Sequence, residues 1–324
     1  MVQPPTGADH QVAPLRTVPP QANAAPSSPV ATAAFHAALR IQTLGGFRVW
    51  RDGAEIDAAA WGRDKAVQLF QFLVTQRRRR LAREQLIDQL WPEADAEAGD
   101  RDFKVALNAI HRALEPERPP RAEPRFIRRF GPAYGLDESD IWIDAAALEA
   151  GVAAGNRALP GDPGAAIGHF RAAADLYAGD YLPERRYDDW ASVETERLQT
   201  LALGAMTRLA DLLLARNALE SLHLTQRVLS FDPVWEDAWR IQMQAHRALG
   251  NPALAIRAWQ RCAEVMDREF GLEPLPATRA VYEAIRRADA VPEGRRPSPR
   301  TATRVPPGAS IRGNEDDNGA DHAP

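Results

Sequence analysis

Polar side chains between residues 100 and 114 have the types and spacing that a DNA-reading helix needs. Helical periodicity over this segment gathers apolar residues on one face, namely Phe103, Ala106, Leu107, Ile110 and Leu114. The opposite face carries Arg101, Lys104, Asn108, His111 and Arg112. Arginine and lysine pair with guanine and asparagine with adenine, and each can instead hold a phosphate. The helix alone leaves two readings open, DNA reading or a solvated face, and Asp100 and Asp102 either cap it or lie where DNA would approach.

Two further groups of arginines lie where a helix-turn-helix protein would meet the DNA backbone. The densest positive charge in the chain, between two predicted helices, is Arg77, Arg78, Arg79 and Arg80. Arg128 and Arg129 lie in a predicted hairpin, in the place of a wing. A charge run is usually a solvated turn, but with the 100–114 helix these arginines form one consistent cationic surface. DNA binding through them would release counterions and therefore depend on salt.

Catalytic and metal-binding patterns are missing from the sequence. It has no GxxxxGK[ST] phosphate loop, no GxGxxG fingerprint and no GxSxG elbow. The seven histidines form no HExxH pair, and the single cysteine, Cys262, can make neither an internal disulfide nor a cysteine-based zinc site. Cys262 is predicted to be buried, as are most of the tryptophans. The pattern indicates a protein that is not an enzyme and that uses no cofactor or metal.

The elements that must position these side chains follow from hydrophobic periodicity. The predicted elements are strands at 39–44 and 47–50, a helix from Asp64, helices at 83–91 and 100–114, and a hairpin of 125–130 with 133–136. Asp52-Gly53 and Gly131-Pro132 supply the tight turns. Strands, three helices and a hairpin in this order predict a winged helix over 39–144, with a small antiparallel sheet in front of it.

The second half of the chain, residues 145–289, predicts helices and no convincing strand. Its helix starts place a capping residue directly before a proline, at Asp162-Pro163, Asp232-Pro233 and Asn251-Pro252. Leu214-Ala-Arg-Asn217 lies 34 residues before Ala248-Leu-Gly-Asn251, which is the tetratricopeptide period of stacked helix pairs. The predicted fold class is mostly α, a winged helix-turn-helix followed by an all-α tetratricopeptide-like helical domain.

Composition and charge limit where the chain works and what it meets. Its 324 residues, 45% hydrophobic and 26% charged, suit about two domains. The net charge of −4 divides into +4 over residues 39–135 and −8 over residues 136–289, so one half can meet a polyanion that the other repels. Residues 1–38 and 290–324 are predicted to be a disordered leader and tail. Without a secretory signal or a span of roughly 18 apolar residues, the chain is predicted to be cytoplasmic, with no membrane partner.

Six blocks of sequence, in order over about residues 39–289, resemble a known family. They are Leu44-Gly-Gly-Phe-Arg-Val-Trp50, Arg83-Glu-Gln-Leu-Ile-Asp-Gln-Leu-Trp-Pro92, Val105-Ala-Leu-Asn-Ala-Ile-His-Arg-Ala-Leu114, Tyr177-Ala-Gly-Asp-Tyr-Leu-Pro183, Trp190-Ala with Glu194-Thr-Glu-Arg-Leu198, and Glu269-Phe-Gly-Leu-Glu-Pro274 followed by Thr278 and Tyr282. The chain resembles the Streptomyces antibiotic regulatory protein (SARP) type of transcriptional activator. That architecture joins an OmpR/PhoB-type winged helix to a bacterial transcriptional activator domain (BTAD).

The resemblance implies a regulator that binds promoter direct repeats in double-stranded DNA as a side-by-side homodimer and recruits RNA polymerase. Carried onto this chain, the recognition helix is 100–114, with Lys104, Asn108, His111 and Arg112 as its contacts. The loop 92–99 matches the loop that contacts polymerase in related winged helices, and its acidic residues are Glu93, Asp95 and Glu97. The alternative is a protein-interaction adaptor whose helical half binds a partner and whose winged helix no longer reads DNA.

Overall fold

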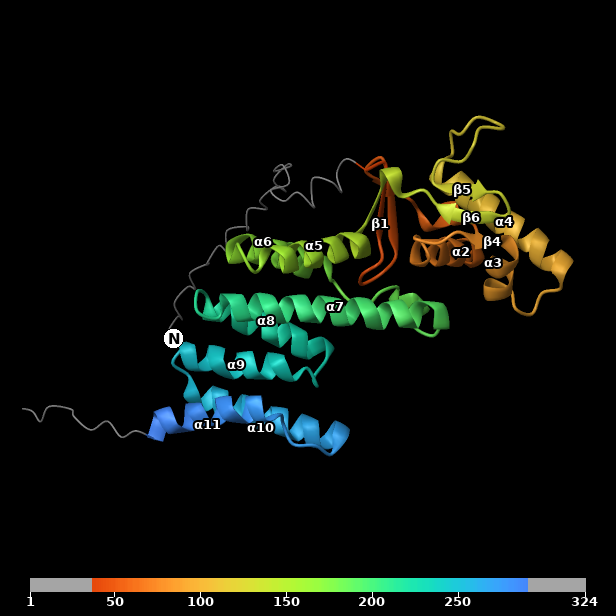
Figure 1. The fold of residues 1–324 in the computed structure, drawn as a ribbon. Coiled ribbons are helices and arrows are strands. Elements are labelled where there is room, and N and C mark those ends of the chain that lie inside the picture. The colour runs from red at the N-terminus through yellow and green to blue at the C-terminus, as the bar shows by residue number, and fades with distance from the viewer. Residues whose placement is uncertain (1–36, 291–324) are drawn as a thin grey trace, which may run out of the picture.

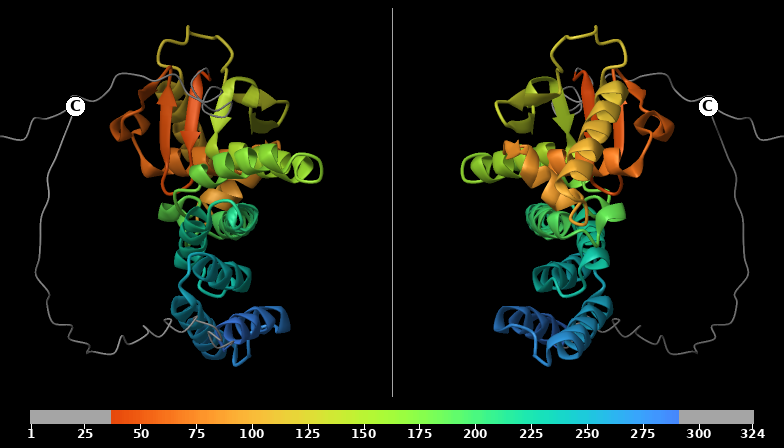
Figure 2. Two further views of the ribbon diagram at one scale, coloured as in Figure 1. Left: turned by 90° about the vertical axis from the view of Figure 1, so that its left-hand side faces the viewer. Right: turned by 90° about the vertical axis from the view of Figure 1, so that its right-hand side faces the viewer.

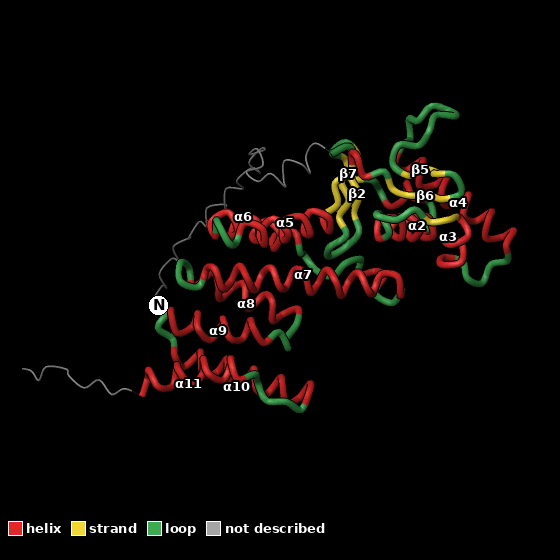
Figure 3. Tube along the Cα trace, in the orientation of Figure 1, coloured by secondary structure: helices red, strands yellow, loops and turns green. Residues whose placement is uncertain are grey.

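The computed structural model describes residues 37–290, so residues 1–36 and 291–324 of the predicted leader and tail lie outside it. Strands occur only in the first half of this range, as the tube in Figure 3 shows. The first half contains β1 (Leu39–Gln42), β2 (Arg48–Arg51), β3 (Ala54–Glu55), η1 (Ala58–Trp61), α2 (Asp64–Thr75), β4 (Leu81–Ala82), α3 (Arg83–Leu90), α4 (Ala96–Leu114), β5 (Ile127–Phe130), β6 (Ala133–Leu136), η2 (Glu138–Asp140) and β7 (Ile141–Ile143). The second half contains α5 (Asp144–Ala158), α6 (Pro163–Leu176), η3 (Pro183–Arg185), α7 (Asp189–Leu213), α8 (Ala218–Phe231), α9 (Glu236–Ala248), α10 (Pro252–Phe270) and α11 (Pro276–Ala290).

The first sheet lies between the winged helix and the helical half (Figure 1). Its strand order is β3-β2-β1-β7, with β1 antiparallel to β2 and parallel to β7. Asp52 and Gly53, both with positive φ, form the predicted tight turn between β2 and β3. The sheet is therefore mixed, whereas the sequence predicted an antiparallel sheet. The sequence did not reveal β7 because three residues are too few to show an alternating pattern.

The winged helix consists of α2, α3, α4 and a second sheet of order β4-β6-β5. Strands β5 and β6 pair in antiparallel fashion around Gly131 and Pro132, which confirms the predicted hairpin. Helix α4 begins at Ala96, earlier than the predicted start at residue 100. The reason is a cap: the Asp95 carboxylate accepts a hydrogen bond from the Ala98 N–H at 2.8 Å. Asp100 and Asp102 therefore do not cap this helix.

The helical half is a stack in which each helix from α5 to α11 packs on the next one along the chain. The layers descend from the winged helix in Figure 1, and both views of Figure 2 show them one below another. This arrangement confirms the tetratricopeptide-like prediction. Asp162 caps α6 by accepting from the Ala165 N–H at 2.9 Å. Helix α10 begins at Pro252 as predicted, but the Asn251 side chain makes no capping hydrogen bond. The prediction at Asp232-Pro233 is wrong, because Asp232 ends α8 and α9 begins at Glu236.

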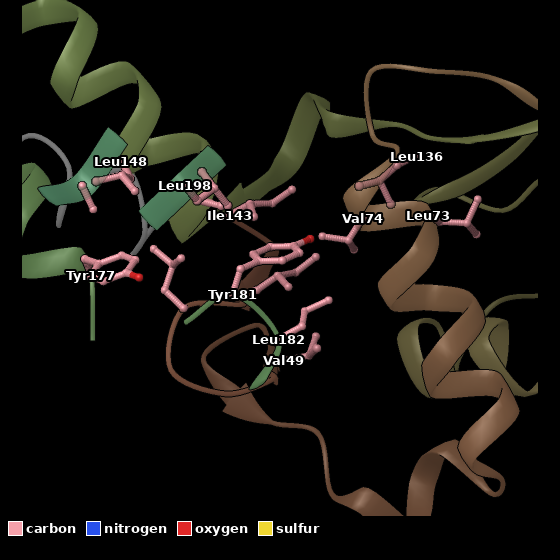
Figure 4. Packing of buried hydrophobic residues seen from close by; sticks show 14 of the residues in the cluster. Val49, Leu73, Val74, Leu136, Ile143, Leu148, Tyr177, Tyr181, Leu182 and Leu198 are labelled. Carbon is pink, nitrogen blue, oxygen red and sulfur yellow. The ribbon is translucent and has the colours of Figure 1, made fainter. Parts of the chain in front are cut away.

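The two halves of the chain share one hydrophobic core. A single cluster of buried side chains runs from Leu39 in β1 to Ala238 in α9. In Figure 4, Val74 of the first half points toward Tyr181 of the second, and Val49 lies beside Leu182. A smaller cluster, which includes Cys262, joins α9, α10 and α11. A cut after residue 144 would expose much of the shared core to water, so the winged helix depends on the helices that follow it.

No helix among residues 37–290 is long and apolar enough to cross a membrane.

Candidate nucleic-acid interface

Helix α4 presents a polar stripe to solvent and is held firmly by its opposite face. Phe103 and Ile110 are almost completely buried, and the Phe103 ring packs against Tyr134 of β6 with centroids 5.1 Å apart. The Arg51 guanidinium of β2 donates to the Ala113 carbonyl at 2.7 Å, which ties the end of α4 to the first sheet. The exposed stripe contains Arg101, Lys104, Asn108 and Arg112. Four of the five side chains predicted for this face therefore lie on it, at spacings of three or four residues.

The fifth, His111, does not lie on the exposed face. His111 is only 7% exposed. Burial, together with the charge of Arg118, lowers the pKa of its imidazole to about 4. A neutral, buried imidazole cannot contact a base or a phosphate, so the prediction for His111 is wrong. Position 111 follows buried Ile110 and lies at the edge of the stripe, where packing against neighbouring segments decides exposure.

Val105 is an exposed residue of α4, beside the polar stripe, that the sequence pattern did not identify. It is 43% exposed, follows Lys104 directly, and lies three residues before Asn108. It also borders two shallow hollows, of about 310 and 430 Å³, that flank the stripe and share Arg112. An exposed branched apolar side chain among cations is the type of group that contacts a thymine methyl. The available signal was its omission from the inward stripe of apolar residues.

Two carboxylates modify the charge at the start of the stripe. Asp100 pairs with Lys104 at 2.6 Å and with Arg83 of α3, also at 2.6 Å. The hydrogen bond from Lys104 and the charges of Arg83 and Lys104 lower the pKa of the Asp100 carboxyl. Asp102 lies 3.6 Å from the Arg101 guanidinium. The cations at this end are therefore partly neutralised, and Lys104 is already paired with a carboxylate of its own helix.

Arg77 does not lie on the cationic surface but in the junction between the two halves of the chain. Its side chain is only 3% exposed, and it pairs with Glu149 of α5 at 3.0 Å and with Glu194 of α7 at 3.6 Å. Burial opposes ionisation of Glu149, but the hydrogen bond from Arg197 and the nearby arginine charges outweigh it and lower the pKa of this carboxyl. A guanidinium enclosed by two carboxylates is not available to a phosphate, so the prediction of Arg77 as a DNA contact is wrong.

The remaining predicted arginines do not all lie together. Arg78, Arg79, Arg80 and Arg128 line one hollow with Phe130, whereas the stripe of α4 borders other hollows. The Arg80 guanidinium lies 3.9 Å from the Phe130 ring centroid, and Arg128 pairs with Asp137 at 3.0 Å. Arg129 is exposed and donates to the Gly131 carbonyl at 2.8 Å, which places it at the hairpin turn. Arg129 is thus the arginine at the tip of the wing.

Comparison with known proteins follows the same division of the chain. Residues 143–286 match the family described as bacterial transcriptional activator domain. Regulatory protein DnrI of Streptomyces peucetius is 28% identical over 268 residues, which cover 78% of this chain and 93% of that protein. The chain is similar to SARP-type transcriptional regulators. Its fold also matches a solved structure described as Mycobacterium tuberculosis EmbR in complex with low affinity phosphopeptide, with a TM-score of 0.66 at 21% identity.

The matches confirm the resemblance seen in the sequence and the predicted fold class. The match to EmbR covers 78% of this chain and 66% of that chain, and it concerns the fold alone. The matched relative and the matched family are described as a regulatory protein and a transcriptional activator domain. Within residues 37–290, no group of three or more His, Cys, Asp and Glu side chains is arranged to hold a metal ion.

The predicted acidic loop 92–99 is shorter in the structure, because α4 already begins at Ala96. Glu93 is exposed in the turn after α3, and Glu97 is exposed in the first turn of α4. Asp95 lies between them and is already used as the cap of α4. Glu93 and Glu97 therefore remain accessible to a partner, whereas Asp95 shapes the segment.

Proposed function

We propose that this chain, like the SARP-type regulators it resembles, binds double-stranded DNA in a sequence-specific manner through α4 and activates transcription. The observation that carries the proposal is the exposed stripe of Arg101, Lys104, Asn108 and Arg112 on a helix whose other face is anchored in the core. The major groove is about 12 Å wide and admits an α-helix. A rigidly held helix positions its side chains against base edges without first ordering the backbone.

The chemistry of the stripe assigns different tasks to its members. Lys104 and Arg112 are suited to guanine or to a phosphate, and Asn108 is suited to the paired donor and acceptor of adenine. Val105 between them supplies an apolar contact for a thymine methyl. Arg129 at the wing tip is placed to reach a phosphate or the neighbouring minor groove. The base contacts specify the sequence, and the phosphate contacts set the register.

Direct repeats, side-by-side dimers and recruitment of RNA polymerase complete the proposal. These three features are supported by the resemblance to SARP-type activators. Glu93 and Glu97, which remain exposed before and at the start of α4, are the acidic side chains proposed for the polymerase contact.

The test begins with the full chain, because the shared core excludes a reliable experiment on residues 39–144 alone. Duplexes selected from a random library define the preferred site, and fluorescence anisotropy then measures Kd at several salt concentrations. Replacement of Lys104 and Arg112 by alanine is expected to weaken binding by about 100-fold, since each contact contributes about 1–3 kcal/mol. If both side chains hold phosphates, the salt slope falls by about two.

Arg216→Ala is the matched control, because Arg216 is an exposed arginine in the turn between α7 and α8. This variant is expected to bind as the unchanged chain does. Retention of the same Kd and the same preferred site by the Lys104, Arg112 double variant would exclude α4 as the reading helix.

A second candidate function, a protein-interaction adaptor, is favoured by one feature of the helical half. Phe270, Leu272 and Leu275 are more than half exposed around the turn between α10 and α11, at the far end of the stack from the winged helix. An exposed apolar group of this kind typically marks contact with another protein. If the random library gives no enriched sequence with the full chain, the adaptor replaces DNA reading as the main function.

A further inference from the structure

The hollow beside the wing sheet is lined by five arginines. It has a volume of about 450 Å³ and is lined by Arg77 to Arg80 on one side and by Arg128 and Phe130 of β5 on the other. Its acidic members are Asp137 and Glu138. The excess of guanidinium groups over carboxylates makes the hollow attractive to an anion.

Strand alternation shows that the hollow opens on the face of the sheet opposite α4. Tyr134 of β6 points toward α4, where it meets Phe103, and Leu81 of β4 pairs with Tyr134 and is buried. Because successive side chains alternate between faces, Arg80 points to the other side, and its contact with the Phe130 ring confirms this direction. A duplex held by the stripe of α4 therefore lies on the far side of this sheet.

The arginines of the hollow differ in how far their charges are neutralised. Arg77 and Arg78 both pair with Glu149, and Arg128 pairs with Asp137. For Arg79 and Arg80, by contrast, no carboxylate of the described chain lies within ion-pair distance. The Arg79 side chain has a single hydrogen bond, at 3.3 Å to the Gln76 side-chain oxygen. Two guanidinium groups thus have donors free for a ligand.

We propose that this hollow is a binding site for a group with two or more neighbouring phosphates. Planar guanidinium groups match phosphate oxygens through paired hydrogen bonds, and several arginines around one hollow suit several adjacent phosphates. The phosphates can come from a free polyphosphorylated small molecule or from a DNA backbone. The orientation of the hollow, opposite α4, favours the free molecule, and this part of the proposal does not depend on DNA reading.

A ligand in this hollow would also reach the junction between the two halves. Arg78 is 69% exposed at the hollow and hydrogen-bonds Glu149 of α5. Glu149 in turn holds Arg77 and Arg197. A phosphate that drew Arg78 away would remove one of the three cations around Glu149. Binding in the hollow would therefore change the ion pairs of α5 in the helical half.

Isothermal titration calorimetry of the full chain with inorganic triphosphate, at constant ionic strength, tests the proposal. The unchanged chain is expected to show saturable binding to one site. Arg79→Glu is expected to weaken this binding by about 10- to 100-fold, which is the loss of one charge-assisted contact. Arg216→Glu makes the same change of charge at an exposed site in the helical half and is expected to leave the triphosphate affinity unchanged.

Arg79→Gln provides a second variant without the charge reversal, and a thermal melt of each protein confirms that it is folded. The two sources of phosphate are separated by measuring Kd for the selected duplex against salt. If triphosphate binds and the salt slope of Arg79→Glu equals that of Arg216→Glu, the ligand is a free polyphosphate. If triphosphate does not bind but the slope of Arg79→Glu is lower by about one, the phosphates belong to the DNA backbone.

If Arg79→Glu changes neither triphosphate binding nor the salt slope relative to Arg216→Glu, the proposed phosphate site is overturned. If the unchanged chain selects no duplex at all, DNA reading fails instead, and the triphosphate titration still reports on the hollow.

Discussion

Removal of a single methyl group from the DNA is expected to identify the base that Val105 reads. Val105 is the one large apolar side chain of α4 that is substantially exposed, and it lies among Arg101, Lys104 and Asn108. Deoxyuridine differs from thymidine only in the missing C5-methyl group, and this methyl lies in the major groove. Replacing each thymine of the selected duplex by uracil, one at a time, therefore probes contact with Val105 directly.

The expected size follows from the buried surface. A methyl group that packs against Val105 gains about 0.8 kcal/mol from the water it displaces. This corresponds to about a fourfold rise in Kd when the methyl is removed. Val105→Ala deletes both γ-methyl groups, so this variant should bind the thymine and uracil duplexes equally well. The substitution also replaces a branched residue by the best helix former, and α4 should therefore not be destabilised.

The assay is a double-mutant cycle by fluorescence anisotropy, with four combinations of unchanged chain or Val105→Ala and thymine or uracil duplex. One thymine position should show a coupling of about 0.8 kcal/mol. Lys104→Ala is the control, because it should weaken binding to both duplexes by the same factor. Equal effects of uracil on the unchanged chain and on Val105→Ala at every position would refute the assignment of Val105.

Three further predictions concern stability, measured by urea unfolding of the full chain. Arg77→Ala should lower the free energy of unfolding by about 3 kcal/mol, because it leaves two mostly buried carboxylates with one cation fewer. The control Arg216→Ala should change the free energy of unfolding by less than about 0.5 kcal/mol. Equal losses in the two variants would contradict the junction role of Arg77. The pKa of His111 is about 4 in the folded chain and 6.5 for a free imidazole, so the unfolded chain binds a proton more readily. The free energy of unfolding should therefore fall as the pH drops from 6.5 to 4. The expected loss is about 2 kcal/mol after allowance for solvent screening. His111→Asn should reduce this pH dependence, and an unchanged pH dependence would count against a buried neutral His111. Gly155→Ala should destabilise the protein by about 1–3 kcal/mol, because the added Cβ would lie 2.6 Å from the Phe170 ring. Gly204→Ala should stabilise its helix by up to about 1 kcal/mol, because no atom lies within 4 Å of the added Cβ. Changes of the same sign in both variants would show that packing at Gly155 does not matter.

Most of the elements were predictable from local sequence. Helical periodicity, the cap at Asp162 and the turn at Gly131-Pro132 depend on residues a few positions apart, and the structure confirms each of them. The errors arose where two local signals competed. Asp232 before a proline resembles a helix start, but it closes α8 instead, and Gly99 resembles a helix break although it lies within α4. The close approach of Ile87 explains the glycine, since a Cβ at residue 99 would lie 2.6 Å from its side chain.

The polar stripe of α4 was largely predictable for the same reason. Arg101, Lys104, Asn108 and Arg112 share a face because a helix turns by about 100° per residue, whatever surrounds it. The exposure of Val105 and the burial of His111 depend on which neighbours cover the edges of that face. Those neighbours come from other segments, and periodicity contains no information about them.

The run from Arg77 to Arg80 shows the limit most clearly. The sequence alone gives no reason to distinguish these four arginines. In the structure Arg77 is buried in the junction and Arg78 pairs with Glu149 of α5, whereas Arg79 and Arg80 have no carboxylate partner among residues 37–290. Glu149 and Glu194, which separate them, lie many residues away along the chain and approach only because the two halves share a core. Burial and pairing are properties of neighbours in space, so the same charge run became part of the junction at one end and part of a ligand-sized hollow at the other.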